Sequence, residues 1–423
     1  MSLAIINYLQ DTQVFFTKQR LFWAQIMTSI GMTPSAGQSL RTFILRVIGT
    51  FAAMILALVA YYIVDGHVGG VLVFFFLFLH IGNYIILTRP KLIPIGIISQ
   101  VTITLIIGYE LQVRKIGIEE ATSNGQAYYP IWQLALIRLA TVLGGLSIAY
   151  FFSIFPYPIT EHSQLRKNLG SSLYLVANYY SIVHETVQVR LAGAEGDTTL
   201  KYSPGRKLEK SRQRIFIKCN ALLGGLRTQS GFVKYDIPIG GRFPSELYTQ
   251  IIADLQSVVN YISLISVASA TFADMQLNDE EKLSSEWLRN FRRIILEAKM
   301  TSQSVATLLA LLSASVTSGN PLPPYLRLPE PYSLSERLDA IDTDILSVRH
   351  IAEPGYASFA VIQIGTKCLV DDLKKVLQGV KQLVGELDFS YHVVSAADQS
   401  KAASREALFY KADEHDDVQS KED

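Results

Sequence analysis

The sequence predicts an all-α protein, in which an integral membrane helical bundle is followed by a cytosolic α-helical bundle. Of its 423 residues, 49% are hydrophobic and only 18% are charged, whereas soluble proteins are about 25% charged. The apolar residues are concentrated before Pro156, and most of the charged residues follow it. After Pro156 the apolar residues recur every three or four positions, which is the period of an amphipathic helix. Two regions in different solvents are therefore expected.

Four segments before Pro156 are apolar over the length that a helix needs to cross the hydrocarbon core of a bilayer, roughly 17 to 25 residues. They are Phe43 to Val64, Val71 to Thr88, Leu92 to Tyr109 and Ile131 to Phe155. Two earlier segments are weaker, because MSLAIINYLQDTQVFF is interrupted by Asp11 and LFWAQIMTSIGM is short. We expect a transmembrane domain over residues 1–156 with about six helices, the first two of which rest on these weaker segments.

Basic residues gather on one side of the four clear segments. Lys and Arg resist translocation, so they mark the cytosolic side. Those on this side are Arg41, Arg89, Lys91, Arg166 and Lys167. This bias places the C-terminal domain, residues 157–394, in the cytosol. Lys18 and Arg20 would lie on the opposite side if both weaker segments span the membrane.

About five amphipathic helices are expected in residues 157–394. Clear apolar stripes run over Leu165–Leu191, Leu247–Ile265 and Ile362–Leu387, the last with near-heptad spacing. Gly- and Pro-rich stretches separate the stripes, so the helices are expected to assemble as a bundle. The tail, residues 395–423, has few apolar residues and is expected to be disordered.

Several classes of function are disfavoured by what the sequence lacks. It has no phosphate-binding Gly-rich loop, no paired-His metal motif and no nucleophile elbow. A net charge of +1 without a clustered basic face argues against nucleic acid as a partner. Cys219 and Cys368 are too few and too scattered for a disulfide framework or a zinc site. We therefore expect no enzymatic activity, no cofactor and no metal.

Arg138 is a permanent cation inside the apolar segment from Ile131 to Phe155. An arginine deep in a span costs about 2.5 to 3.5 kcal/mol on insertion scales, so it normally faces the bundle interior and has a partner. In one interpretation Arg138 is part of a path for a substrate anion. In the other it forms a structural pair with Glu110, which follows the preceding segment on the same side of the membrane. The two are compatible if the pair opens during transport.

Arg46 is a second cation, about one turn inside the first clear segment. There it would either attract anions from the cytosol or extend to the lipid headgroups. The following Gly49 and Thr50 have small side chains that permit close packing of helices.

Three further polar candidates lie in the other segments. His80 and Asn83 share one face of a helix, and Gln100 lies in the middle of the next segment. Such groups either form hydrogen bonds between helices or line a pore. Because none of the four segments contains Asp or Glu, a path for anions is favoured over a path for cations.

Long co-linear stretches of the sequence match a known family. They are RLFWAQIMTSIGMTPSAGQSLRTFILRVIGT (Arg20 to Thr50), YYIVDGH (Tyr61 to His67), LIIGYELQVRKIGIEEATSNGQAYYPI (Leu105 to Ile131) and IFPYPITEHSQLRKNLGSSLYLVANYYSIVHETV (Ile154 to Val187). On these stretches the chain resembles the fungal brefeldin A-sensitivity-related family of the aromatic acid exporter, or fusaric-acid-resistance-like, superfamily. The resemblance extends well over Met1 to about Leu191 and more loosely over the rest.

The resemblance implies a membrane half of six helices, a cytosolic helical domain and a role in exporting organic, often aromatic, anions. Trp23, Arg46, Gly49 and Thr50 match the superfamily pattern and are carried over as candidate pore or packing residues. Members of the family usually have a second, upstream membrane half. We therefore expect this chain to be a fragment, a truncated sequence or a half-sized protein, and two copies could pair to replace the missing half.

The expected function is export of organic or aromatic carboxylates across the plasma membrane or the endoplasmic reticulum membrane. The residues expected along the path are Arg138, Arg46, His80, Asn83, Gln100 and Trp23, the last as a stacking surface for an aromatic ring. The expected partners are the lipid bilayer, small organic anions and another copy of the chain or a second membrane half. An anion channel is a close variant. The alternative is a non-transporting scaffold of the secretory pathway, which exposed apolar residues on the cytosolic helices would indicate.

Overall fold

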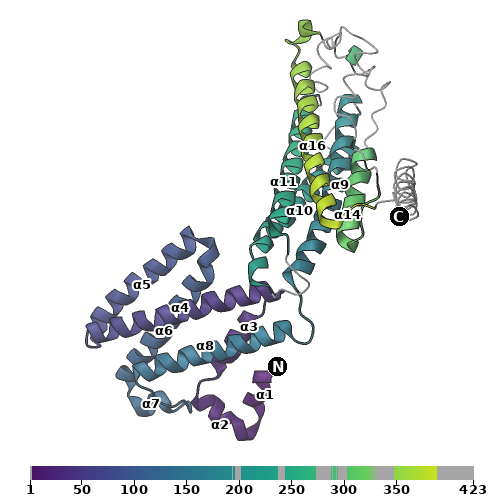
Figure 1. Cartoon of the computed structure of the whole chain (residues 1–423). Helices are drawn as coiled ribbons and strands as arrows, with labels where there is room; N and C mark the ends of the chain where they lie inside the picture. The colour runs from purple at the N-terminus through teal and green to yellow at the C-terminus, as the bar shows by residue number, and fades with distance from the viewer. Residues whose placement is uncertain are drawn as a thin grey trace, which may run out of the picture. The chain divides into compact units, whose positions relative to one another are not determined.

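The computed structural model describes residues 2–192, 194–195, 202–236, 243–272, 287, 289–291, 293, 303–324, 326, 328 and 347–387. The regular secondary structure in these ranges is helical, which confirms the predicted all-α class; one isolated β-bridge joins Leu322 to Glu386. The chain divides into two compact units (Figure 1). Unit 1 comprises Met1–Arg166 with Gly225–Ser245, and unit 2 comprises Lys167–Gly224 with Glu246–Asp423. The tail that the sequence predicts to be disordered, residues 395–423, lies outside the described residues.

Four helices of unit 1 are long and apolar enough to cross a membrane, and the chain is an integral membrane protein. They are α4 (Ala36–Ile63), α5 (Val68–Thr88), α6 (Ile93–Ile116) and α8 (Ile131–Ile154). Each covers all or nearly all of one of the four apolar segments identified in the sequence. Helix α6 continues past the predicted end at Tyr109, so Glu110 belongs to the helix, and the expectation that these spans lack acidic residues is wrong there.

The two weaker segments form three short helices, α1 (Ser2–Tyr8), α2 (Gln10–Lys18) and α3 (Phe22–Gly31). The longest, α3, has 10 residues and is about 15 Å long at 1.5 Å per residue, half of the hydrocarbon thickness. Arg20 lies between α2 and α3 with a positive φ of 56°, so the chain turns there instead of continuing as one helix. None of these three helices therefore has the length of a span, and α3 packs against α8 (Figure 1).

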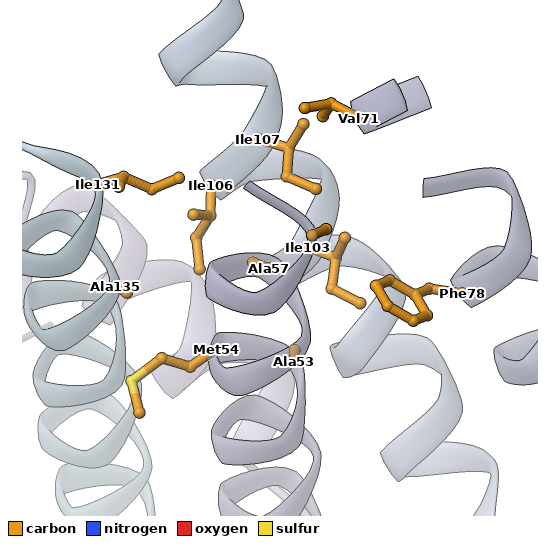
Figure 2. Close-up of a cluster of buried hydrophobic side chains, with 11 residues drawn as sticks. Ala53, Met54, Ala57, Val71, Phe78, Ile103, Ile106, Ile107, Ile131 and Ala135 are labelled. Carbon is orange, nitrogen blue, oxygen red and sulfur yellow. The ribbon is translucent and has the colours of Figure 1, made fainter. Parts of the chain in front are cut away.

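The core of unit 1 forms where α4, α5, α6 and α8 meet. Its buried side chains include alanines of α4 and isoleucines of α6, some of which are labelled in Figure 2. Ala53, Ala57 and Ala60 on α4 are completely buried. At Gly49 an added Cβ would lie 2.5 Å from Ile98 Cγ2 on α6, so only glycine permits this approach of the two helices. Small residues thus let the backbones of α4 and α6 come close, as in other membrane helix pairs.

Two buried carboxylates connect the segment after α8 to α4. Asp236 accepts hydrogen bonds from the backbone N–H groups of Glu161 (2.6 Å) and His162 (3.3 Å), and so caps the N-terminus of α9 (Glu161–Ala192). The side chain of Glu161 is buried in turn, and its Oε1 accepts a hydrogen bond from Ser35, the N-cap residue of α4. Its Oε2 is buried with no hydrogen-bond partner in the described part of the chain. Burial and the neighbouring Asp236 raise the pKa of Glu161, although the Ser35 hydrogen bond lowers it.

The raised pKa of Glu161 predicts a stability that falls with rising pH. The folded chain holds the Glu161 proton at pH values where the unfolded chain has lost it, above its ordinary pKa of 4.5. Stability should therefore decline as pH rises from that value through the raised pKa of the folded state. Glu161→Gln is expected to remove this part of the decline and to raise the thermal midpoint at neutral pH, measured in detergent over a pH series. The same change at Glu185, exposed on α9, is the control and should leave the pH profile as it is.

Unit 2 is built from α9, α10 (Pro204–Ser230), α11 (Ser245–Ala268), α14 (Gln303–Ser318) and α16 (Pro354–Val384), with the first turns of α9 and the last turns of α10 belonging to unit 1. The predicted apolar stripes are its core. The completely or almost completely buried residues include Leu169, Leu173, Ile251, Leu255, Ile262, Leu369, Leu373 and Val376. At Gly379 an added Cβ would lie 2.7 Å from Ile251 Cγ1, so α16 and α11 are in close contact.

Helix α11 is also apolar and long enough to cross a membrane, counted over Ser245–Phe272. In the structure its apolar stripe is buried against other helices of unit 2. Its C-terminal end is polar, because Arg190 of α9 donates hydrogen bonds to Ser266 O and Ser269 Oγ, both at 3.0 Å. The burial of this stripe inside unit 2 agrees with the bundle that the sequence predicts for this region.

Candidate functional site: a cationic cavity in the membrane unit

A cavity of about 330 Å³ opens in unit 1 between α3, α6 and α8. Two arginines, Arg20 and Arg138, are among the residues that line it. The others are Trp23, Thr104, Leu105, Ile106, Gly108, Tyr109, Gln112, Gln126, Leu134, Ile137 and Thr141. None of these lining residues is Asp or Glu. The cavity wall therefore carries two formal positive charges and no negative charge.

Each arginine of the cavity lies over an aromatic ring. The Cζ atom of Arg138 is 3.8 Å from the centre of the Trp23 ring, and that of Arg20 is 3.7 Å from the centre of the Tyr109 ring. Trp23 is in the first turn of α3, which packs on α8 and so brings the indole to Arg138. Such contacts contribute about 2 kcal/mol when desolvated, and Arg138 is only 9% exposed. The rings hold the guanidinium groups without neutralising them.

Several polar groups that line the cavity have no hydrogen-bond partner in the described part of the chain. Arg20 Nη2 donates to the backbone oxygen of Ala127 at 3.3 Å. Arg20 Nε and the hydroxyl of Tyr109 are buried with no partner among the described residues. The guanidinium of Arg138 likewise has no hydrogen bond or ion pair within that part of the chain. Because unsatisfied buried donors and unpaired charges are costly, the cavity is suited to an anion.

The structural pair between Arg138 and Glu110 is not formed in the structure. Glu110 accepts a hydrogen bond from Tyr61 (3.1 Å), and its carboxylate lies 3.8 Å from Nε of Arg114, one turn further along α6. One interpretation of the sequence paired Glu110 with Arg138, but Arg114 lies at the i,i+4 position on the same helix and is the cation beside the carboxylate. Glu110 does not line the cavity.

Arg46 lies away from the cavity. An added Cβ at Gly31, the last residue of α3, would be 3.8 Å from Arg46 Nη1, so Arg46 lies near the other end of α3 from Trp23. Its Nη1 is buried with no hydrogen-bond partner in the described ranges. The hydroxyl of Thr50 is hydrogen-bonded to the backbone oxygen of Arg46 at 2.8 Å, within α4.

His80, Asn83 and Gln100 do not line the cavity either. Nε2 of Gln100 donates to Asn83 Oδ1 at 3.0 Å and to Leu79 O at 3.3 Å, which ties α6 to α5. His80 is exposed, and the centre of its ring lies 4.2 Å from that of Phe76, on the same helix. Of the two functions open to Asn83 and Gln100, the structure shows the hydrogen bond between helices.

Arg20 and Tyr109, which form the second cation–aromatic pair of the cavity, are among the lining residues that the sequence analysis did not identify. A signal was present for Arg20, because it lies on the wrong side of the charge bias if both weaker segments span. The structure gives the reason: Arg20 stands at the turn before α3, and its guanidinium enters the cavity instead of flanking a span. Tyr109 is the last residue of the third apolar segment, and no sequence pattern around it marks it as a site residue.

Comparison with known proteins identifies the family of the chain. Residues 3–152 match the family described as Fusaric acid resistance protein-like, and residues 160–388 match the Brefeldin A-sensitivity protein 4-like domain. An uncharacterized protein of Schizosaccharomyces pombe is 22% identical over 324 residues, which are 73% of this chain and 21% of that protein. The chain thus spans about a fifth of the length of the curated relative it matches. Because the second match alone covers more than half of the chain, the chain belongs to the Brefeldin A-sensitivity protein 4-like family and carries a fusaric acid resistance-like membrane region before that domain.

Proposed function

We propose that the chain takes part in the export of organic carboxylate anions, with the cavity around Arg20 and Arg138 as the substrate site. The observation that carries the proposal is the presence of two arginines, and no acidic residue, in the wall of one cavity of the membrane unit. Intramembrane cations of this kind mark anion paths and ligand counter-ions. The fusaric acid resistance-like match over residues 3–152 supports a transport-related role.

The rest of the cavity wall suits a substrate with an apolar body. Leu105 and Ile106 of α6 face the same space as Leu134 and Ile137 of α8, and Trp23 adds an aromatic surface. Binding sites for small molecules are typically apolar with a few polar groups that fix orientation. An aromatic carboxylate such as benzoate meets both requirements.

The test is efflux of labelled benzoate from sealed liposomes that contain the purified full chain. Benzoic acid crosses bilayers in its protonated form, so the assay is run at alkaline pH with protein-free liposomes for subtraction. Arg138→Gln is expected to reduce the protein-dependent flux about tenfold or more, because a charge-assisted hydrogen bond contributes about 1.5 to 3 kcal/mol. Flux that is driven by voltage and not by a proton gradient would identify the channel variant.

Arg89→Gln is the matched control, because Arg89 is an exposed cation at the end of α5 and does not line the cavity. Its flux should equal that of the wild type. Equal flux in the Arg138 and Arg89 variants would contradict the assignment of the cavity as the substrate site.

A second candidate function is a partner-binding scaffold of the secretory pathway. The observation that favours it is a set of exposed apolar side chains on α11 and α16, including Val267 (65% exposed) and Ile364 (60% exposed). Leu264 of α11 lies 4.0 Å from where a Cβ at Gly365 of α16 would be, so these exposed residues belong to adjacent parts of the two helices. The Brefeldin A-sensitivity protein 4-like match covers this unit. Absence of flux from the wild-type chain would favour the scaffold.

A further inference from the structure

We propose that the cavity binds an organic dianion, with one carboxylate received by Arg20 and the other by Arg138. The inference rests on the proposed function and names the class of substrate. It follows from the number of cations, from the N–H groups of the guanidinium planes that are available to a ligand, and from the apolar surface beside them.

The charges of the cavity wall favour a ligand with two negative charges. Both guanidinium groups line the same cavity, and no lining residue is acidic. The nearest acidic residue along α6, Glu110, is engaged by Tyr61 and Arg114. A monoanion would leave one of the two cations without a counter-charge in a medium of low dielectric, where an unpaired charge costs several kcal/mol. A single ligand with two negative charges would neutralise both cations of the wall.

The orientation of the arginines determines how a ligand can approach them. Each guanidinium has one flat face against an aromatic ring, Arg138 on Trp23 and Arg20 on Tyr109. The remaining strong interaction is in the guanidinium plane, along the N–H edge, which is the direction in which carboxylates form paired hydrogen bonds. Arg20 donates from Nη2 to Ala127 O, and its Nε is buried without a partner among the described residues. Arg138 keeps its whole edge free of acceptors from the described part of the chain.

The size and the apolar surface of the cavity limit the body of the dianion. A volume of about 330 Å³ is at the lower end of the range of about 300 to 1,000 Å³ found for ligand sites. Leu134 and Ile137 contribute apolar surface from α8, on the turns beside Arg138. A single aromatic ring that carries two carboxylates fits both limits.

The experiment compares isophthalate with monomethyl isophthalate by isothermal titration calorimetry on the full chain in nanodiscs at alkaline pH. The two probes have nearly the same shape and differ by one negative charge. Isophthalate is expected to bind about tenfold or more tightly, the effect of one additional charge-assisted contact. Arg20→Gln and Arg138→Gln should each reduce this ratio to about one, while Arg89→Gln should leave it unchanged.

Equal affinities of the wild-type chain for the two probes would overturn the dianion assignment. In that case measurable binding of the monoester and flux of benzoate would leave the proposed function standing. If neither probe bound and benzoate did not move, both proposals would fail together. Because the comparison of probes uses the unaltered chain, the result does not depend on whether the variants fold.

Discussion

Arg190→Met is expected to destabilise unit 2 by about 3 to 5 kcal/mol, the cost of breaking a buried ion pair by removing one partner. Arg190 is 7% exposed, and its Nε lies 3.1 Å from a carboxylate oxygen of Glu195, which is 3% exposed. The same guanidinium donates to Ser266 O and Ser269 Oγ of α11. Methionine fills a similar volume but leaves the Glu195 carboxylate buried without a cation.

The measurement is hydrogen–deuterium exchange of the full chain in detergent, followed in peptides from α9 and α11. Protection in unit 2 should fall in Arg190→Met, and a second change, Glu195→Gln, should restore much of it by removing the orphaned charge. Arg214→Met is the control, because Arg214 is exposed on α10. A protection pattern in Arg190→Met that matches this control would show that the network does not stabilise the bundle.

Gly145→Ala is expected to displace α3 from α8 and to weaken the stack of Arg138 on Trp23. A Cβ at Gly145 would lie 2.4 Å from the backbone oxygen of Ala24 and 3.0 Å from Met27 Cβ, so the α3 backbone must move. The hydrogen bond from Thr28 Oγ1 to Gly145 O, 2.9 Å long, joins the helices at the same point. Overpacking of this kind costs about 1 to 3 kcal/mol.

Gly144 provides a control at the adjacent position, because a Cβ there would meet no atom within 4 Å. Gly144→Ala should therefore be neutral or slightly stabilising, since alanine is the better helix former. We expect reduced benzoate flux and a lower thermal midpoint in Gly145→Ala and neither in Gly144→Ala. The same result for both variants would mean that α3 does not depend on this contact.

The predictable part of the site was Arg138, and the unpredictable part was its environment. A single arginine in an apolar segment stands out because of its desolvation cost, which is a property of the residue and its sequence neighbours. Its partner does not stand out, because Trp23 and Glu110 are both compatible with the sequence. The contact of α3 with α8, made possible by Gly145, brings Trp23 to Arg138. The i,i+4 spacing on α6 places Glu110 beside Arg114.

The environment of three other polar residues was equally unpredictable from the sequence: His80, Asn83 and Gln100. As polar residues in apolar segments they qualified for the path, but the hydrogen bond from Gln100 to Asn83 uses two of them to join α5 to α6. Which polar groups face one another depends on the rotation of each helix about its axis. That rotation is set by close contacts such as the one between Gly82 and Gln100, where an added Cβ would be 2.6 Å from Gln100 Nε2.

The sequence by itself determined the all-α class, the four apolar spans of the membrane unit and the apolar stripes of unit 2, because length, hydropathy and helical period are local properties of the chain. Tertiary structure alone decided that α3 is a short helix docked on α8, that Asp236 caps α9, and that Arg20 joins Arg138 in one cavity. These features depend on contacts between residues far apart in the chain. Such contacts are selected by close packing and by the need to satisfy buried polar groups, neither of which a local pattern records.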